Sequence, residues 1–281
     1  MRLIVWGAGY TGRAVAAAAA CEVMVVSRAP TLPGDVAFDA AGPALDRATH
    51  LLATAPPGED GDPVLHRYGG RLGHLRWVGY LSSTGVYGDR NGGWVDEDSE
   101  PAPSSPRGAR RLAAEEAWRT ACAGVPLDII RLAGIYGPNR SVLDDVRRGT
   151  ARRVDAPGHA FGRIHRDDIA RLVLAATARA PAGTRVLHGA DDFPAPSADV
   201  VAEAARLLGV PPPPLLPLEE ALRSMSPMAR SFWADNRKVS CRATKAALNL
   251  SWRCPTFREG LRLVLQQEIE GPGQQQEVSR A

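Results

Sequence analysis

The sequence predicts an α/β fold, a doubly wound parallel sheet with a smaller carboxyl-terminal substrate lobe. A short apolar run at residues 2–6 ends in a glycine-rich turn at 7–12, and an alanine-rich helical stretch follows. Short β-rich runs then alternate with helical stretches, as is typical of βαβ units that build one parallel sheet. The pattern changes after residues 137–138, where the second lobe is expected to begin. Together these features indicate a Rossmann-type core.

The β-rich runs of the first half are short, mostly apolar and followed by small or polar residues, as expected of buried strands. They cover residues 2–6, 21–26, 36–38, 50–53, 77–81 and 127–130. Right-handed crossovers between parallel strands place the functional loops at the carboxyl ends of those strands.

Helical patterns fill the remaining segments. Asp62 is placed to cap a helix over 62–73, with Pro63 in its first turn. A longer helix is expected over 107–122. The second half predicts helices over 141–149, 167–178, 197–208 (capped by Ser197), 230–250 and 256–265, a strand over 184–187, and an extended linker at the four prolines 211–214.

The composition excludes several classes of protein. The 281 residues include 34 Lys and Arg against 31 Asp and Glu, a net charge of +3 that is too weak and too dispersed for nucleic-acid binding. The longest apolar stretch, 14–21, is far short of the roughly 20 residues of a membrane span. The chain begins directly with a strand, so no targeting segment is expected and a cytoplasmic location is predicted.

The cysteines and the acidic residues predict no metal site. The four cysteines lie far apart and are interpreted as reduced thiols; they are Cys21, Cys122, Cys241 and Cys254. The acidic run 96–98, with Glu100 close behind, is interpreted as a solvated loop.

The turn at 7–12 has the spacing GxGxxG, follows a strand and opens a helix, which is the context of a dinucleotide-binding motif. Glycines there allow a tight turn, a close approach of the backbone to a pyrophosphate and close packing of helix on strand. The helix start then stabilises the phosphate charge. The predicted cofactor contacts are Gly7, Ala8, Gly9, Tyr10, Thr11 and Gly12.

The residues after the second strand predict which cofactor binds. NAD usually requires an acidic residue there for the ribose hydroxyls, but this chain has Ser27 and Arg28. A guanidinium suits a 2′-phosphate, because it donates paired hydrogen bonds. NADP is therefore predicted, with NAD as the alternative.

Five motifs together resemble the extended short-chain dehydrogenase/reductase superfamily, the NAD-dependent epimerase/dehydratase family. They are GAGYTG at 7–12, LSSTGVYG at 81–88, LAAEE at 112–116, RLAGIYGP at 131–138 and RIHRDDIA at 163–170. The likeness extends over residues 1–268 and is closest to an atypical bacterial subgroup. It implies a core of 1–139, to which 160–190 return, a substrate lobe of 140–159 and 191–270, and a disordered tail at 271–281.

The resemblance also implies roles for single residues. Asp39 would lie near the adenine, and Ala53, Thr54 and Ala55 would line the cofactor after the fourth strand. Ser83 matches the family's catalytic hydroxyl, which bonds a substrate oxygen, and Thr84 is its substitute. The segment 94–97 matches a substrate loop at the mouth of the pocket.

The chain departs from the family at its catalytic pair. The family has Tyr-x-x-x-Lys shortly before the LAAEE motif, and this chain has Arg107 and Arg111 at those positions. Arginine cannot exchange a proton near neutral pH, although Arg111 can still bind the nicotinamide ribose. The proton would then come from Tyr87, Tyr136 or His165, or the protein binds the cofactor without standard catalysis.

Two functions follow as expectations. The first is an NADP-binding oxidoreductase or epimerase/dehydratase-like enzyme for an unknown small molecule; the alternative is a catalytically reduced NADP-binding sensor or partner protein. The arginine pairs 110/111, 147/148 and 152/153 are either solvated or meet a substrate phosphate. A homodimer through helices 62–73 and 107–122 is expected from the resemblance and from the small residues Ala113, Ala114, Ala117 and Ala121.

Overall fold

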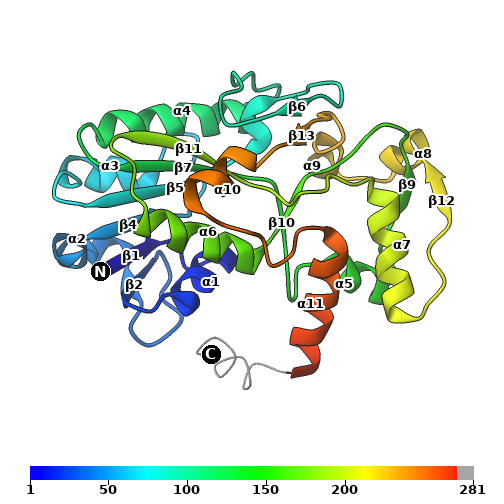
Figure 1. Cartoon of the computed structure of the whole chain (residues 1–281), viewed down its shortest axis with the longest axis horizontal. Helices are drawn as coiled ribbons and strands as arrows, with labels where there is room; N and C mark the ends of the chain where they lie inside the picture. The colour runs from blue at the N-terminus through cyan, green and yellow to red at the C-terminus, as the bar shows by residue number, and fades with distance from the viewer. Residues whose placement is uncertain (271–281) are drawn as a thin grey trace.

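The computed structural model describes residues 1–270 and has a seven-stranded parallel sheet at its centre (Figure 1). The strand order is β11-β7-β5-β4-β1-β2-β3. The strands are β1 (Arg2–Trp6), β2 (Glu22–Ser27), β3 (Val36–Ala37), β4 (His50–Ala53), β5 (Trp77–Ser83), β7 (Leu127–Leu132) and β11 (Thr184–Gly189). The predicted α/β fold with a doubly wound parallel sheet is confirmed.

Helices cover both faces of this sheet because successive residues of each central strand point to opposite sides. In β1, Leu3 and Val5 pack with α1 (Tyr10–Ala18), α6 (Arg166–Ala178) and α10 (Arg242–Leu248). Ile4 and Trp6 pack on the other side with α2 (Gly42–Arg47), α3 (Pro63–Tyr68) and α4 (Pro106–Ala121). Short 3-10 turns follow some elements, at Phe38–Ala40, Gly69–Arg71 and Thr84–Tyr87.

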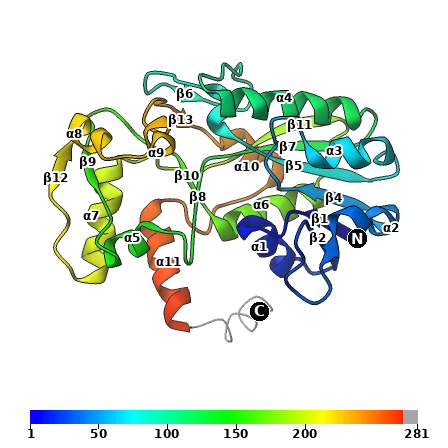
Figure 2. The same ribbon diagram turned by 180° about the vertical axis from the view of Figure 1, so that it is seen from behind.

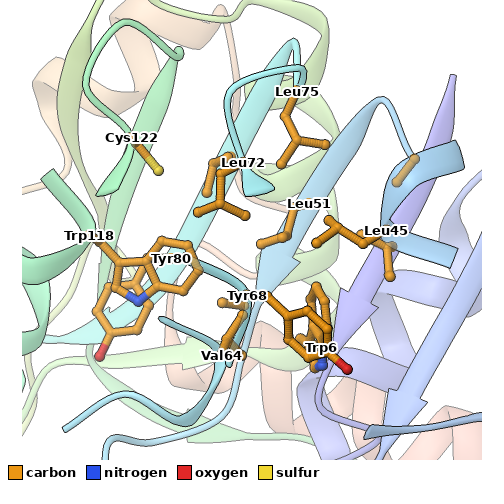
Figure 3. Packing of buried hydrophobic residues seen from close by; sticks show 14 of the residues in the cluster. Trp6, Leu45, Leu51, Val64, Tyr68, Leu72, Leu75, Tyr80, Trp118 and Cys122 are labelled. Carbon is orange, nitrogen blue, oxygen red and sulfur yellow. The ribbon is translucent and has the colours of Figure 1, made fainter. Parts of the chain in front are cut away.

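Large aromatic side chains fill the space between the sheet and helices α2, α3 and α4, as Figure 3 shows. Tyr80 of β5 stacks on Trp118 of α4 with ring centroids 5.6 Å apart. The Trp118 indole donates to the Asp62 carboxylate at 3.0 Å, and Asp62 also accepts from two backbone N–H groups at the start of α3. The predicted Asp62 cap is therefore present, and it joins α3 to α4.

The second lobe has a small core of its own. Side chains of α5 (Val142–Arg147), α7 (Ser197–Leu208) and α11 (Phe257–Glu270) form one buried cluster. Beside it, β9 (Arg153–Asp155) pairs with β12 (Leu215–Pro217), and α8 (Leu218–Arg223) and α9 (Pro227–Ser231) follow (Figure 2). The assignment of residues to two lobes stays a prediction; within the range 191–270, α10 packs on α6 and β11 of the core.

Two further strand pairs connect distant parts of the chain. β8 (Gly134–Tyr136) pairs with β10 (Arg163–His165), and β6 (Trp94–Val95) pairs with β13 (Lys238–Val239). Both pairs are parallel, so each places two strand ends at the same edge.

The expectation of one helix over 230–250 is wrong. α9 ends at Ser231, β13 occupies 238–239 and α10 begins at Arg242. Tertiary hydrogen bonds hold the segment between them extended: the Asn236 N–H donates to Asp89 at 2.8 Å and its carbonyl accepts from the Arg90 N–H at 3.1 Å. The helix expected over 256–265 is present as α11, and it begins at Phe257. The tail predicted at 271–281 lies outside the described residues.

The alanines of α4 do not form one stripe. Ala114 is buried against the sheet and Ala121 packs beside it, whereas Ala113 and Ala117 are exposed. The helix therefore offers small residues to both its own core and its outer face.

Candidate functional site

The glycine turn leaves β1 and enters α1 in a shape that requires glycine at two of its positions, Gly7 and Gly12. Gly7 has φ 120°, and a Cβ on it would lie 2.2 Å from the Thr54 hydroxyl oxygen. A Cβ on Gly12 would lie 2.0 Å from the Gly7 carbonyl oxygen. A Cβ on Gly9 would have no atom within 4 Å, so the space above Gly9 is open. The turn is therefore packed where helix meets strand and open where a pyrophosphate would lie, which fits a dinucleotide.

The other residues of the turn have structural contacts. Thr11 is buried in the first turn of α1, and Ala8 is half-buried. The Tyr10 hydroxyl donates to the Pro138 carbonyl at 3.0 Å, and its ring lies 5.0 Å from the Arg166 guanidinium carbon. Tyr10 thus links the turn to the loop after β8.

The end of β2 carries the residues expected to meet the adenosine. Arg28 is exposed and makes no side-chain hydrogen bond or ion pair with any of residues 1–270. Ser27 makes a local turn, with its oxygen 3.2 Å from the Ala29 nitrogen. Behind them Asp35, with its side chain only 3% exposed, accepts from Arg13 of α1 at 2.5 Å and from the N–H groups of Thr31 and Leu32. This ion pair fixes the loop that presents Arg28.

The remaining predicted cofactor contacts lie on neighbouring strand ends. Asp39 is exposed on the 3-10 turn after β3, 3.5 Å from Arg67. Ala53 is buried at the end of β4. The Thr54 hydroxyl lies 3.1 Å from the Trp6 carbonyl, so it braces the glycine turn from below, and Ala55 follows it.

A cleft of about 940 Å³ opens at the carboxyl ends of β5 and β7, between the sheet and the second lobe. Ser83, Thr84, Arg107 and Arg111 all line it, so the structure brings the predicted catalytic positions together. The Ser83 oxygen accepts from the Gly85 N–H at 3.1 Å, which leaves its own proton free for a ligand. Thr84 is almost completely buried.

The two arginines at the family's catalytic positions differ in their contacts. Arg111 donates through Nη1 to the Leu81 carbonyl at 2.9 Å and to the Tyr80 hydroxyl at 3.1 Å, which fixes its guanidinium against β5. Arg107 forms no hydrogen bond within the described chain, and its guanidinium lies 5.7 Å from the centre of the Phe232 ring. Neither can supply a proton, because a guanidinium keeps its proton at any physiological pH.

Tyr87 lies outside the cleft and is fully buried. Its hydroxyl accepts from Arg131 at 2.7 Å and lies 2.6 Å from Nε2 of His188. Burial raises its pKa to about 12, against the opposing effect of the Arg131 charge. A phenol held in this way has no access to a substrate in the cleft, which argues against Tyr87 as the proton donor.

Tyr136 and His165 are also poorly placed as donors. The Tyr136 ring lines the cleft, but a Cβ on Gly260 would lie 1.7 Å from its hydroxyl oxygen, so the hydroxyl points at α11. Burial raises the pKa of Tyr136 and lowers that of His165, which is 0% exposed. The Nδ1 atom of His165 accepts from the Asp167 N–H at 3.2 Å, so the imidazole caps α6.

Two buried polar features near the site were not predicted from the sequence. Glu115 and Arg131 form an ion pair at 2.6 Å with both side chains at most 3% exposed, and Ser82 donates to Glu115 at 2.5 Å. Both residues lie in the motifs at 112–116 and 131–138, but nothing in those motifs shows that they pair. Asp191 is 1% exposed without a well-formed hydrogen bond, and burial raises its pKa to about 8 against the effect of Arg163.

Other kinds of site were also considered. Within residues 1–270, no three His, Cys, Asp or Glu side chains are grouped to hold a metal ion. No helix in that range is long and apolar enough to cross a membrane. Of the predicted arginine pairs, Arg110, Arg111 and Arg152 line the cleft, whereas Arg147 and Arg148 form ion pairs with Glu268 and Asp145.

Curated relatives match only part of the chain, and no family model matches it. A 3-diazoavenalumate denitrifying reductase from Streptomyces is 31% identical over 146 residues, 47% of this chain and 45% of that protein. A dTDP-L-rhamnose 4-epimerase from Burkholderia thailandensis is 27% identical over 175 residues, 55% of this chain and 43% of that protein. The chain thus spans less than half the length of the curated relatives it matches.

Solved structures match almost the whole chain. A human epimerase family protein, SDR39U1, solved with NADPH, has TM-score 0.79 and 19% identity over 95% of this chain and 100% of that one. A Bacillus cereus UDP-glucuronic acid 4-epimerase solved with NAD has TM-score 0.72 and 17% identity over 95% and 99%. A conserved protein of unknown function from Silicibacter pomeroyi has TM-score 0.86 and 38% identity over 96% and 99%. The chain therefore belongs to the family of this Silicibacter protein, and its fold is that of the extended short-chain dehydrogenases/reductases and NAD-dependent epimerases.

Proposed function

We propose that the protein is an NADP(H)-dependent oxidoreductase that acts on a small molecule in the cleft, in an atypical bacterial subgroup that lacks the Tyr-x-x-x-Lys pair. The observation that carries this proposal is the glycine turn, which is packed at Gly7 and Gly12 and open at Gly9. It lies at the carboxyl end of β1, at the same edge of the sheet as the cleft. Bound NADPH supplies a hydride there.

Each part of the cofactor has candidate partners among the residues of this chain. The backbone N–H groups at the start of α1 would hold the pyrophosphate, and Arg28, with Ser27, would hold the 2′-phosphate. Asp39 would lie near the adenine, and residues 53–55 would line the cofactor. The NADPH in the human relative supports this choice, and the NAD in the Bacillus epimerase keeps NAD as the alternative.

In the cleft, Ser83 would donate its free proton to a substrate oxygen, with Thr84 as the substitute. Arg107 and Arg111 would stabilise developing negative charge without transferring a proton. A hydride acceptor that is already activated requires no phenol at the moment of transfer, so a reductase is favoured over an epimerase, which has to remove a proton. The name of the 31% identical relative, a reductase, agrees with this preference.

The test is a fluorescence titration of the full chain with NADPH, compared with the Gly9→Val variant. Gly9 has φ −80° and free space around its Cβ position, so the variant should fold normally. Its side chain would occupy the space proposed for the pyrophosphate, and NADPH binding should therefore weaken at least tenfold. Unchanged binding in Gly9→Val, with an unchanged thermal melt, would refute the proposed cofactor site.

A catalytically reduced NADP-binding protein is the second candidate. The observation that favours it is the placement of Tyr87 and Tyr136, whose hydroxyls do not face the cleft. Absorbance at the reduced-nicotinamide band, followed with a panel of carbonyl and activated substrates, separates the two functions. Tight NADPH binding with no oxidation by any of them supports the second.

A further inference from the structure

The cleft has two chemically different walls. The wall formed by the start of α4 carries Arg107, Arg110 and Arg111, all of which line the cleft. Arg107 and Arg110 make no hydrogen bond or ion pair with any other described residue, and only Arg111 is fixed, by Leu81 and Tyr80. Three guanidinium groups within five residues of one helix repel one another and face the positive end of that helix. A bound anion would remove this unfavourable arrangement.

The cleft offers these arginines no counter-charge. Asp145 and Asp235 are the acidic side chains among its described lining residues. Asp145 pairs with Arg148 at 2.7 Å. Asp235 accepts from Arg237 at 2.9 Å and from the Ser104 hydroxyl at 2.5 Å. Within the described lining, no acidic side chain is left to pair with Arg107 and Arg110, so an anionic ligand would find both guanidinium groups available.

An aromatic part of the lining adjoins these arginines, and Arg140, Arg152, Arg163 and Arg237 line other parts of the cleft. Phe232 lines the cleft while 54% exposed, and its ring faces the Arg107 guanidinium at 5.7 Å. Beside it, Trp233 packs on Phe161 with ring centroids 4.9 Å apart. The contact of Arg107 with Phe232 shows that the cationic and apolar walls adjoin, so one small molecule can contact both.

The polar groups of the lining are arginine guanidinium groups and the hydroxyls of serines, threonines and one tyrosine. Among residues 1–270, no asparagine, glutamine, glutamate, lysine or histidine lines the cleft, and its two aspartates are already paired. Sugar hydroxyls and base edges need such amide and carboxylate partners, because buried polar groups without partners are costly. A sugar or nucleobase would find hydroxyl and guanidinium partners here, but no side-chain amide and no unpaired carboxylate among the described residues.

We propose that the substrate is an apolar organic carboxylate, with a planar or otherwise hydrophobic body. Its carboxylate binds Arg107 and Arg110, whose guanidinium groups match a carboxylate with paired hydrogen bonds. Its body lies against Phe232 and Trp233. This inference rests on the proposed function, because it names the substrate class of the same cleft.

The experiment measures binding by isothermal titration calorimetry, using the full chain with and without saturating NADPH. Cinnamate is the probe; cinnamyl alcohol has the same body without the charge, and acetate has the charge without the body. Both should bind at least tenfold more weakly than cinnamate. Uridine diphosphate tests the alternative of a nucleotide ligand.

Variants locate the binding. Arg107→Gln with Arg110→Gln should weaken cinnamate binding at least tenfold, and so should Phe232→Ala. Arg76→Gln is the matched control, because Arg76 is an exposed arginine just before β5, at the opposite edge of the sheet. This variant should bind cinnamate as tightly as the parent protein. All these side chains are exposed, so the variants should keep the thermal melt of the parent.

The outcomes separate this inference from the proposed function. If NADPH binds but cinnamate binds no tighter than acetate, or more weakly than uridine diphosphate, the inference is overturned and the proposed function stands. If cinnamate binds and depends on Arg107 and Arg110 while NADPH does not bind, the carboxylate site is supported and the proposed function fails.

Discussion

At the scale of single residues, we expect Arg28 to determine which cofactor binds. It is exposed at the end of β2, makes no ion pair within residues 1–270, and stands on a loop that the buried Asp35 holds against Arg13. Because the loop is already held, binding a phosphate has to order the Arg28 side chain but not the loop that carries it. Discrimination between NADP and NAD should therefore depend on this residue.

We expect Arg28→Ala to weaken NADPH binding by about 1–3 kcal/mol, because one charge-assisted hydrogen bond is lost. NADH binding should stay the same, since NADH has no 2′-phosphate. Fluorescence titrations with both cofactors measure the difference. Arg76→Ala serves as the control for the change of charge, and an equal loss for NADPH and NADH would contradict the assignment.

The buried carboxyl of Asp191 should make the free energy of unfolding depend on pH. Its carboxyl is protonated in the folded chain up to about pH 8, whereas in the unfolded chain it ionises near its usual pKa of about 3.9. Between these values the folded state holds the additional proton, so the free energy of unfolding falls as the pH rises. Asp191→Asn removes this effect, because an amide stays neutral.

The free energy of unfolding of the parent should fall between pH 5 and pH 8, and that of Asp191→Asn should not fall for this reason. The difference between variant and parent should therefore shift in favour of the variant by at least about 1 kcal/mol between the two pH values. Urea unfolding at both pH values measures the gain. Asp192→Asn is the matched control: Asp192 pairs with Lys245 at 2.9 Å and should give no comparable change between the two pH values. A difference for Asp191→Asn that is the same at pH 5 and pH 8 would show that Asp191 is ionised in the fold.

At the scale of elements, the sequence predicted what local patterns determine. The β1–turn–α1 unit, the Asp62 cap and the long helix α4 follow from glycine spacing, an Asp–Pro start and helical periodicity, and all are present. The predicted Ser197 cap is wrong: Ser197 is the first residue of α7, Pro196 is its N-cap, and no side chain caps the helix. β8 and β10 have three residues each, too short for any periodicity, and were not expected. The segment after α9 has a helical pattern but is held extended by Asp89 and Arg90, partners more than 140 residues earlier in the chain.

The same limit applies to the candidate site. The positions of Ser83, Arg107 and Arg111 at the cleft follow from motif spacing on strand ends and on one helix. The direction in which a side chain points cannot be predicted from motif spacing. The Tyr136 hydroxyl, for example, points at Gly260, which lies more than 120 residues further along the chain. Pairing such as that of Glu115 with Arg131 likewise becomes visible only when β7 and α4 are packed together.

The cap of α3 gives a prediction at this scale. Asp62 is 3% exposed and accepts from Val64 and Leu65 of α3 and from the Trp118 indole of α4. Asp62→Ala should lower the free energy of unfolding by about 2–4 kcal/mol, because it removes a helix cap and leaves a buried indole N–H without an acceptor. Urea denaturation measures the loss, and Asp60→Ala, an exposed neighbour, is the control. A loss below about 0.5 kcal/mol would mean that α3 does not depend on this cap.

At the scale of the whole molecule, a buried polar chain connects the core to the carboxyl-terminal segment. It runs from Ser82 through Glu115, Arg131 and Tyr87 to His188, whose Nδ1 lies 2.7 Å from the Ser240 carbonyl. Every link is 2.7 Å or shorter, and the first member, Ser82, lines the cleft. Because partly satisfied buried networks are costly, this chain should hold the segment before α10 in one position relative to β5 and β7. The strands beneath the cleft are then held rigidly, whereas Arg107 and Arg110, which have no hydrogen-bond partner among the described residues, can adapt to a ligand.

The outer face of α4 carries the last prediction, a homodimer. Ala109, Ala113 and Ala117 are exposed at helical spacing on this face, and such small side chains let two helices approach closely. The exposed part of α3 flanks the same layer of the molecule (Figure 1). Light scattering at micromolar concentration should therefore give twice the chain mass of 29.9 kDa. Ala113→Glu places a charge in the centre of the proposed contact and should give monomers that keep NADPH binding, whereas Ala17→Glu, at an exposed position of α1, should stay dimeric. A monomeric parent protein would exclude this assembly, and a dimeric Ala113→Glu would move the contact to another face.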